Sequence, residues 1–529
     1  MSNDGEQRQV KQVSSASARA RAGSRARERS LLPPRYAPDI VSAARRNVGA
    51  LDALFAIVPH PPDAAALRRL PESARWRELH ARAPARAGSV RTTVLGNRRH
   101  TLAVLGYLAS DASAFERLSL AGRMLKEAAA RAPKIIGLAA AGPAASARAA
   151  LEALLAAALA HTFPLPSWRA SRQEDWIIRR LVLLNDVGLD TRYATAAARG
   201  TNLARWLTSL PPNILDARGY RNAIASLARA HGLALRWLDE RALQRAGAQA
   251  FLAVAAGNAE RGAGIAHLQY RPARNRRGAR PEVALIGKGI LFDTGGVNLK
   301  THRSMLDMHT DMAGSAVALA TLLALAELRA PLAADAWLAI TENRIGPHSY
   351  RPQEVVRAAN GVTIQVIHTD AEGRMVLADT LALASRTRPR LMIDFATLTG
   401  ACVYALTERM SGVFSNRAEL AAALVEAGRA SGERLWSFPF EADYDAELES
   451  KVADVVQCSV EGKGDHILAT RFLSRFVPEG TPWAHIDLSS ATRTGGLAHV
   501  PTEVTGFGVR LALELLLKQK VTQSLERSR

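Results

Sequence analysis

Short apolar runs and longer runs rich in Ala and Leu alternate along this chain of 529 residues. HTLAVLGYLA (100–109) and KIIGLAA (134–140) are short and aliphatic, which predicts strands. A long Ala/Leu-rich stretch follows each of them and predicts a helix. The alternation therefore predicts a small α/β domain over residues 37–170.

The same alternation continues through the second half of the chain and predicts a larger α/β domain over residues 213–520 with a mostly parallel central sheet. Its predicted strands are EVALIGKG (282–289), AWLAIT (336–341), TIQVIH (363–368), LMIDFATL (391–398) and AHIDLS (484–489). Polar residues and glycines follow each strand, so we expect a site at the carboxyl ends of the strands. Residues 171–212 are helical in character and are expected to connect the domains.

The two ends of the chain differ from these domains. Residues 1–36 are rich in Ser, Ala and Arg and have no apolar periodicity, which predicts a disordered basic tail. Acidic residues in this segment (Asp4, Glu6 and Glu28) argue against a transit peptide, and an apolar signal-peptide core is lacking. Residues 521–529 are expected to form a C-terminal tail.

The composition of the chain bears on whether it binds nucleic acid, in which compartment it acts and whether it spans a membrane. The net charge of +20 raises DNA as a partner, although scattered arginines without interleaved aromatic residues are a weak signal for nucleic acid. The two cysteines, Cys402 and Cys458, cannot build a disulfide framework or a cysteine-based zinc site, which favours a reducing compartment and a cytoplasmic protein. The most apolar stretch ends at Glu327, so a membrane span is not expected.

Lysine is rare in this chain and its placement is informative. Between residues 135 and 450 the only lysines are Lys288 and Lys300, both in GKGILFDTGGVNLK (287–300). A lysine amine can lose its proton and offer a lone pair, which an arginine guanidinium cannot do. Two of these few lysines could also lie close together by chance.

Carboxylates gather in the same predicted loops. Asp293 and Asp311 flank the second lysine, and HTDAEGR (368–374) supplies Asp370 and Glu372. Converging carboxylates need positive charge, and a divalent ion such as zinc, manganese or magnesium supplies it. An isolated Asp-x-Glu pattern is more often an ordinary acidic helix start.

Four motifs taken together resemble the leucyl (cytosol) aminopeptidase family, and the resemblance covers about residues 200–515. They are GKGILFDTGGVNLK (287–300), MHTDMAGSA (308–316), HTDAEGRMVLADTL (368–381) and IDFATLTGA (393–401). The resemblance implies two divalent ions per chain, Mn²⁺ or Zn²⁺. Its implied ligands are Lys288, Asp293, Asp311, Asp370 and Glu372, with Asp293 and Glu372 bridging, Lys288 and Asp311 completing the tighter site, and Asp370 serving the more exchangeable one.

The resemblance also implies roles for residues around the ions. Lys300 and Arg374 occupy the two catalytic positions, and Arg374 would hold a bicarbonate. Met308, Thr397 and Leu398 occupy positions that line an apolar pocket for the first substrate side chain. The implied assembly is a homohexamer. His309 and His368 depart from the family pattern, and we expect them to orient the ligand loops rather than bind metal.

The expected function is therefore that of an enzyme, a dinuclear-metal aminopeptidase. It would remove N-terminal, preferentially leucine-like residues from peptides with a metal-activated water. The alternative is a DNA-binding or architectural protein on the same fold, supported by the basic tail and the net charge. The sequence leaves open the native metal, the preferred residue and the biological peptide.

Overall fold

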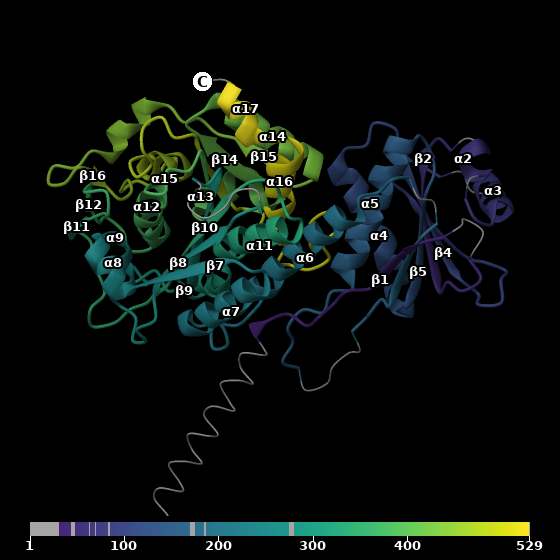
Figure 1. Ribbon diagram of the computed structural model, residues 1–529, viewed down its shortest axis with the longest axis horizontal. Helices are drawn as coiled ribbons and strands as arrows, with labels where there is room; N and C mark the ends of the chain where they lie inside the picture. The colour runs from purple at the N-terminus through teal and green to yellow at the C-terminus, as the bar shows by residue number, and fades with distance from the viewer. Residues whose placement is uncertain are drawn as a thin grey trace, which may run out of the picture.

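The computed structural model shows two lobes (Figure 1). It describes residues 31–43, 48–62, 64–68, 70–82, 85–169, 175–184, 187–273 and 280–527. The first 30 residues, and with them most of the expected basic tail, lie outside the described part. Leu31 is 3% exposed and accepts a hydrogen bond from Trp206 Nε1, so the chain already packs against the fold from residue 31, before the expected boundary at residue 36.

The N-terminal lobe is an α/β unit around a six-stranded sheet of order β1-β6-β5-β2-β4-β3. All of its pairings are parallel except that of β3 with β4. Its strands are β1 (Asp39–Ser42), β2 (Ala53–His60), β3 (Val90–Val94), β4 (Leu102–Ala109), β5 (Ile135–Ala140) and β6 (Arg180–Leu183). Its helices are α2 (Ala64–Arg68), α3 (Ser73–Arg82), α4 (Ala114–Ala128) and α5 (Ala144–His161).

The second lobe is built on an eight-stranded sheet of order β15-β14-β17-β13-β9-β10-β8-β7. Its strands are β7 (Ala234–Asp239), β8 (Gly264–Tyr270), β9 (Val283–Asp293), β10 (Ala334–Asn343), β13 (Leu391–Ala396), β14 (Ser411–Ser415), β15 (Leu435–Ser437) and β17 (Trp483–Asp487). The four central strands, β17 to β10 in that order, are parallel. This confirms the predicted α/β class with a mostly parallel central sheet.

Helices cover both faces of this sheet, which explains why its central strands are apolar throughout. The helices of this lobe are α6 (Thr191–Thr208), α7 (Ala217–Ala230), α8 (Glu240–Ala246), α9 (Gln249–Ala255), α11 (Ala313–Glu327), α12 (Glu372–Ser385), α13 (Gly400–Leu406), α14 (Ala418–Ser431), α15 (Asp465–Ser474), α16 (Val509–Leu513) and α17 (Val521–Arg527). Leu285 of β9 packs in the core that contains α11, and its neighbours Ala284 and Ile286 pack in the core that contains α12. Both helices begin beside the middle of β9, because a Cβ atom on Gly287 would meet the first turn of α11 and one on Gly373 of α12 would meet Lys288.

Three sequence expectations need correction. The stretch TIQVIH contributes β12 (Thr363–Gln365), but this strand joins a separate small sheet with β11 (Val355–Arg357) and β16 (Val455–Val456). The segment expected to be a helical connector contributes β6 to the N-terminal sheet before α6 begins. The expected C-terminal tail forms α17, whose Val521 is buried, because the apolar periodicity continues to the end of the described chain.

The most apolar helical stretch, His302–Glu327, is long and apolar enough to cross a membrane, but 83% of its most apolar window is buried inside the fold. Helix α11 within it contacts α6 on one side and the sheet on the other. Burial of this kind is typical of a core helix that is hydrophobic all round.

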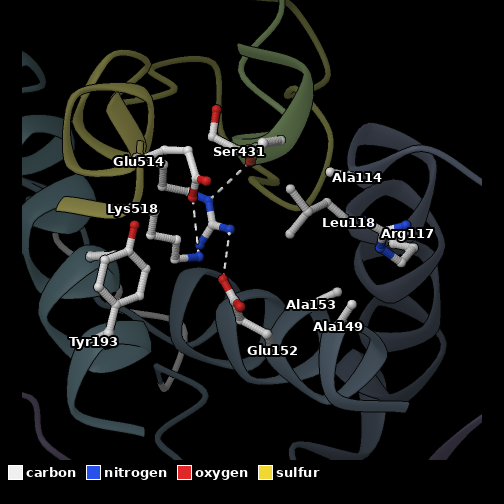
Figure 2. A pocket seen from close by; sticks show the side chains of 13 residues that line it. Ala114, Arg117, Leu118, Ala149, Glu152, Ala153, Tyr193, Ser431, Glu514 and Lys518 are labelled. Carbon is white, nitrogen blue, oxygen red and sulfur yellow. Dashed lines mark hydrogen bonds and ion pairs between the residues drawn. The ribbon is translucent and has the colours of Figure 1, made fainter. Parts of the chain in front are cut away.

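An ion pair joins the two lobes beside a cavity of about 180 Å³ (Figure 2). Arg510 of the second lobe donates from Nη2 to Glu152 of α5 at 3.3 Å. Lys518 Nζ lies 3.1 Å from Glu514 Oε2 and 4.4 Å from the centre of the Tyr193 ring. The residues that line this cavity do not include any of the predicted site residues, so the candidate chemistry lies elsewhere.

Candidate functional site

The predicted site residues come from the carboxyl edge of the central sheet. Lys288 lies within β9, and Asp293 is the last residue of that strand. Asp311 precedes α11, and Glu372 is the first residue of α12. Parallel strands and the helices that follow them place their loops at one edge of the sheet, so residues 84 positions apart in sequence meet in space.

The Lys288 amine lies among the carboxylates. Its Nζ is 2.8 Å from Asp311 Oδ1 and 3.0 Å from Glu372 Oε1, and it donates to the Thr397 carbonyl at 2.8 Å. The side chain is 3% exposed. An amine in this position has three oxygen partners and no room to turn toward solvent.

Lys300 approaches the same carboxylates from the loop after β9. Its Nζ lies 2.9 Å from Asp293 Oδ2 and 2.5 Å from Asp370 Oδ1. Asp293 Oδ1 also accepts from Asn343 Nδ2 and from the Gly295 amide, each at 2.8 Å. The two lysines and the four carboxylates together form a compact cluster of mixed charge, called the ring below: Lys288, Lys300, Asp293, Asp311, Asp370 and Glu372.

Burial and crowding shift the pKa of several groups in this ring. Burial raises the pKa of Asp311 and of Glu372, each to about 7. Burial alone would lower the pKa of Lys288, but the nearby carboxylates, Asp311 first, outweigh it and raise that pKa. Burial of these carboxylates together therefore favours their neutral forms, and additional positive charge at the site would favour the ionised forms.

The carboxylate oxygens that meet here are suitable ligands for a divalent metal ion. Ligand atoms of Asp293, Asp370 and Glu372 all lie within 4.8 Å of one another. Asp311 Oδ2 and Glu372 Oε2 are buried and have no hydrogen-bond partner in the described part of the chain. Buried carboxylate oxygens without partners cost free energy, and coordination of a cation would remove that cost.

Arg374 follows Glu372 by two positions in α12 and is 2% exposed. Its Nη2 donates to both carboxylate oxygens of Asp465 at 2.8 Å, and its Nη1 donates to the Gln457 carbonyl at 3.3 Å. The predicted catalytic arginine is therefore close to the carboxylates along α12, but its guanidinium points to a different carboxylate.

The three predicted pocket residues lie in two loops beside the ring. Thr397 and Leu398 follow β13, and Met308 lies half-buried in the short helix η2 (Met308–Thr310). The Thr397 hydroxyl donates to Asp311 Oδ1 at 2.7 Å, so this residue also supports a candidate ligand. Leu398 packs partly against the core on the α12 side.

The two histidines lie at the margin of the site. His368 is exposed, and its Nδ1 accepts from the Asp370 amide at 3.3 Å. His309 is half-buried, and burial lowers its pKa. Neither histidine belongs to the group of candidate ligands found among the described residues.

Several residues that shape the site were not predicted from the sequence. Thr369 donates to the Gly295 carbonyl at 2.6 Å and so joins two ligand loops. Asp487 accepts from the Thr399 hydroxyl at 2.7 Å and from the Leu398 amide at 3.1 Å. Asn343 and Asp487 each end a strand beside the site strands, which is the one sequence signal that could have identified them.

Known proteins are similar to this chain in sequence and in fold. Residues 202–513 match the cytosol aminopeptidase family, catalytic domain. The chain is 41% identical over 345 residues to a probable cytosol aminopeptidase of Syntrophotalea carbinolica, which is 63% of this chain and 68% of that protein. A 41% identity over 327 residues to a probable cytosol aminopeptidase of Parasynechococcus marenigrum covers 61% of this chain and 66% of that protein.

Solved structures agree with these matches. A mutant of tomato leucine aminopeptidase superposes with a TM-score of 0.79 at 27% identity, covering 92% of this chain and 98% of that one. The bottromycin maturation enzyme BotP in complex with Mn superposes with a TM-score of 0.76 at 30% identity, covering 89% and 100%. The chain therefore belongs to the cytosol aminopeptidase family and is a metal-dependent aminopeptidase.

Proposed function

We propose that this aminopeptidase uses two divalent ions to remove apolar, leucine-like residues from the N-termini of peptides. One observation carries the proposal: four carboxylates and a buried lysine amine from separate loops converge at one edge of the central sheet. The proposed ligands are Lys288, Asp293, Asp311, Asp370 and Glu372. Asp293 and Glu372 would bridge the ions.

Bound metal would offset the free energy that it costs to bury several carboxylates close together. Two divalent ions at these ligands would supply positive charge that polarises a peptide carbonyl and lowers the pKa of water. Lys288 would bind as a neutral amine, which is a role that arginine cannot fill. Metal binding favours the ionised carboxylates and would release any proton bound to them.

Lys300 has a different proposed role. Its amine is held at the edge of the ring by Asp293 and Asp370, and its side chain is 13% exposed, so it faces the ligands and remains accessible. A charged donor in this position would stabilise the oxygen that becomes negative when water attacks the peptide carbonyl.

The apolar preference rests on the residues around Lys300. Met308 and Leu398 lie beside the ring, and Leu299 and Leu306 expose apolar side chains in the loops that flank Lys300, with exposures of 58% and 65%. Apolar surface around a few polar groups is typical of a site for small hydrophobic substrates.

The remaining proposals follow from family membership. Mn²⁺ or Zn²⁺ would fill the site, and Mn is the ion that BotP binds in its solved structure. The chain would act in the cytoplasm as a homohexamer. The relatives described above support peptide hydrolysis and give no support to the alternative of a DNA-binding protein.

A panel of aminoacyl amides tests the substrate proposal. Full-length protein would be freed of metal, reloaded with Mn²⁺ or Zn²⁺, and assayed on leucyl, methionyl, alanyl and aspartyl amides. We expect leucyl amide to be hydrolysed roughly tenfold or more faster than alanyl or aspartyl amide, because an apolar pocket discriminates by the side chain it buries. Preference for the aspartyl amide would overturn the proposed specificity and leave the metal assignment in place.

A further inference from the structure

Arg374 is already occupied by a carboxylate of its own chain. Its Nη2 donates to both oxygens of Asp465 at 2.8 Å. Its Nη1 donates to the Gln457 carbonyl at 3.3 Å, which leaves only Nε without a partner in the described part of the structure. The guanidinium that the family resemblance assigns to bicarbonate thus donates to protein groups from both terminal nitrogens.

Several features hold this pair in place. Arg374 is in the first turn of α12, where backbone and side chain are buried. Asp465 is the first residue of α15, which favours an ionised carboxylate because the helix N-terminus carries partial positive charge. Gln457 links Arg374 to the loop before α12. Its carbonyl accepts from Arg374, while its Oε1 accepts from the His368 amide at 3.1 Å and its Nε2 donates to the Ala371 carbonyl at 3.0 Å. The loop that leads to Asp370 and Glu372 is therefore tied to the Arg374 pair.

A dissolved bicarbonate does not fit this arrangement. It would have to replace Asp465 on Nη2, or it would lie beside a carboxylate of the same sign. Like charges a few ångströms apart in a partly buried site repel each other strongly. The Asp465 side chain is 25% exposed, so it is neither free in solvent nor easily displaced from a buried guanidinium.

We propose that Asp465 takes the place of the external anion at Arg374, so that peptide hydrolysis by this chain does not depend on bicarbonate. Asp465 is in this sense a positioning residue: it holds Arg374 beside the carboxylate ring with a charge-assisted hydrogen bond. The inference deepens the proposed function and rests on Arg374 serving the peptidase reaction.

The first test needs no substitution. Metal-loaded protein would be assayed on leucyl amide in carbon dioxide-depleted buffer with increasing bicarbonate at constant pH and ionic strength. We expect kcat to stay within about twofold across the series, because both terminal nitrogens of Arg374 already donate to groups of the protein. A several-fold rise in kcat that saturates with bicarbonate would overturn the proposal.

Variants at Asp465 supply the second test. Asp465→Ala should lower kcat roughly tenfold, as expected for loss of one charge-assisted pair. The same variant should then gain a response to bicarbonate or formate, because the guanidinium becomes free to bind a small anion. Asp465→Glu should retain most of the activity without added anion. An Asp465→Ala protein that keeps full activity, or that no small anion activates although it folds and binds metal, would contradict the proposal.

The chain offers a matched control. Asp445 accepts from Nε and Nη2 of Arg471 at 2.7 Å, so it makes a similar pair with an arginine of α15. This pair is separate from Arg374. Asp445→Ala should not create a bicarbonate response, whereas a response equal to that of Asp465→Ala would assign the effect to general loosening of α15 and contradict the proposal.

A binding measurement separates this inference from the proposed function. The line width of ¹³C-labelled bicarbonate in NMR reports anion binding whether or not peptide is hydrolysed. We expect the Asp465→Ala variant to broaden the bicarbonate line. The native protein should broaden it no more than the Asp465→Ala, Arg374→Ala double variant does. Absence of hydrolysis with every metal would refute the proposed function alone, while broadening by the native protein that Arg374→Ala removes would refute the role of Asp465 alone.

Discussion

Gly373 leaves the space that the Lys288 side chain fills. A Cβ atom on Gly373 would lie 2.6 Å from Lys288 Cε and 2.7 Å from Nζ. No ordinary carbon contact is this short, so any larger residue at position 373 must displace the lysine. The packing of one glycine in α12 therefore controls a candidate metal ligand in β9.

Gly373→Ala should remove metal and activity without unfolding the protein. Alanine favours a helix by about 1 kcal/mol over glycine, and the atoms that must move are the end of one side chain. Metal content by mass analysis and the melting temperature would be compared with Gly400→Ala, where the nearest atom to a new Cβ is 4.0 Å away. A Gly373→Ala enzyme with native metal content and turnover would show that Lys288 does not need its present position.

Lys288→Arg tests the chemistry of the same ligand. A guanidinium keeps its proton and cannot coordinate, so we expect the metal content to fall from two ions toward one per chain and hydrolysis to be lost. Lys451→Arg is a suitable control, because Lys451 is exposed and distant in sequence from the site. Two retained ions with full turnover would exclude Lys288 as a ligand.

Lys300→Ala should separate catalysis from metal binding. Loss of one donor to a developing negative charge typically lowers kcat by roughly 10²–10³. KM should change little, and both ions should stay bound, since Lys300 would act on the transition state. Steady-state kinetics and metal analysis on the same preparation check this. A changed KM with an unchanged kcat would assign Lys300 to substrate binding instead.

The sequence predicted the α/β class, the family and the loops that meet at the site. It could do so because β9 and β13 are apolar runs followed at once by polar residues, and because the ligand motifs are local in sequence. The roles assigned to those residues stay predictions. The structure adds that Lys288 and Lys300 both contact the carboxylates whose ligation was predicted.

The features that sequence reasoning missed depend on contacts between distant segments. Asp465 lies 91 positions after Arg374, and nothing in its local pattern distinguishes it from an ordinary acidic helix start. Strand β6 lies in a stretch predicted to be helical, because four residues are too few to establish a strand periodicity against long flanking helical patterns. Pairing with β1 and β5 decides its conformation.

His161 makes stability depend on pH at the junction of the lobes. Burial, with added repulsion from Arg205 and Lys126, lowers its pKa from 6.5 to about 4. As the pH falls, His161 therefore takes up a proton near pH 6.5 in the unfolded chain but only near pH 4 in the folded protein. This residue thus lowers the free energy of unfolding as the pH falls through that window. The effect approaches about 3 kcal/mol below pH 4.

Denaturant unfolding at several pH values checks this against His161→Gln. The native protein should lose free energy of unfolding relative to the variant between pH 6.5 and 4, and the two should run parallel above pH 7. His302→Gln serves as the control because His302 is exposed. Parallel curves for the native protein and His161→Gln over the whole range would show that His161 takes up its proton normally in the fold.

If two divalent ions at the ring make this chain a peptidase, hydrolysis must rise with the number of bound ions when metal is returned to the metal-free protein. Mn²⁺ or Zn²⁺ would be added in known ratios while bound metal and the hydrolysis of leucyl amide are measured together. We predict no hydrolysis without metal, full activity at two bound ions per chain, and loss of the second ion in Asp370→Ala. Full hydrolysis by protein shown to be free of metal, or a plateau of activity at one bound ion that Asp370→Ala leaves unchanged, would show that hydrolysis does not require two ions.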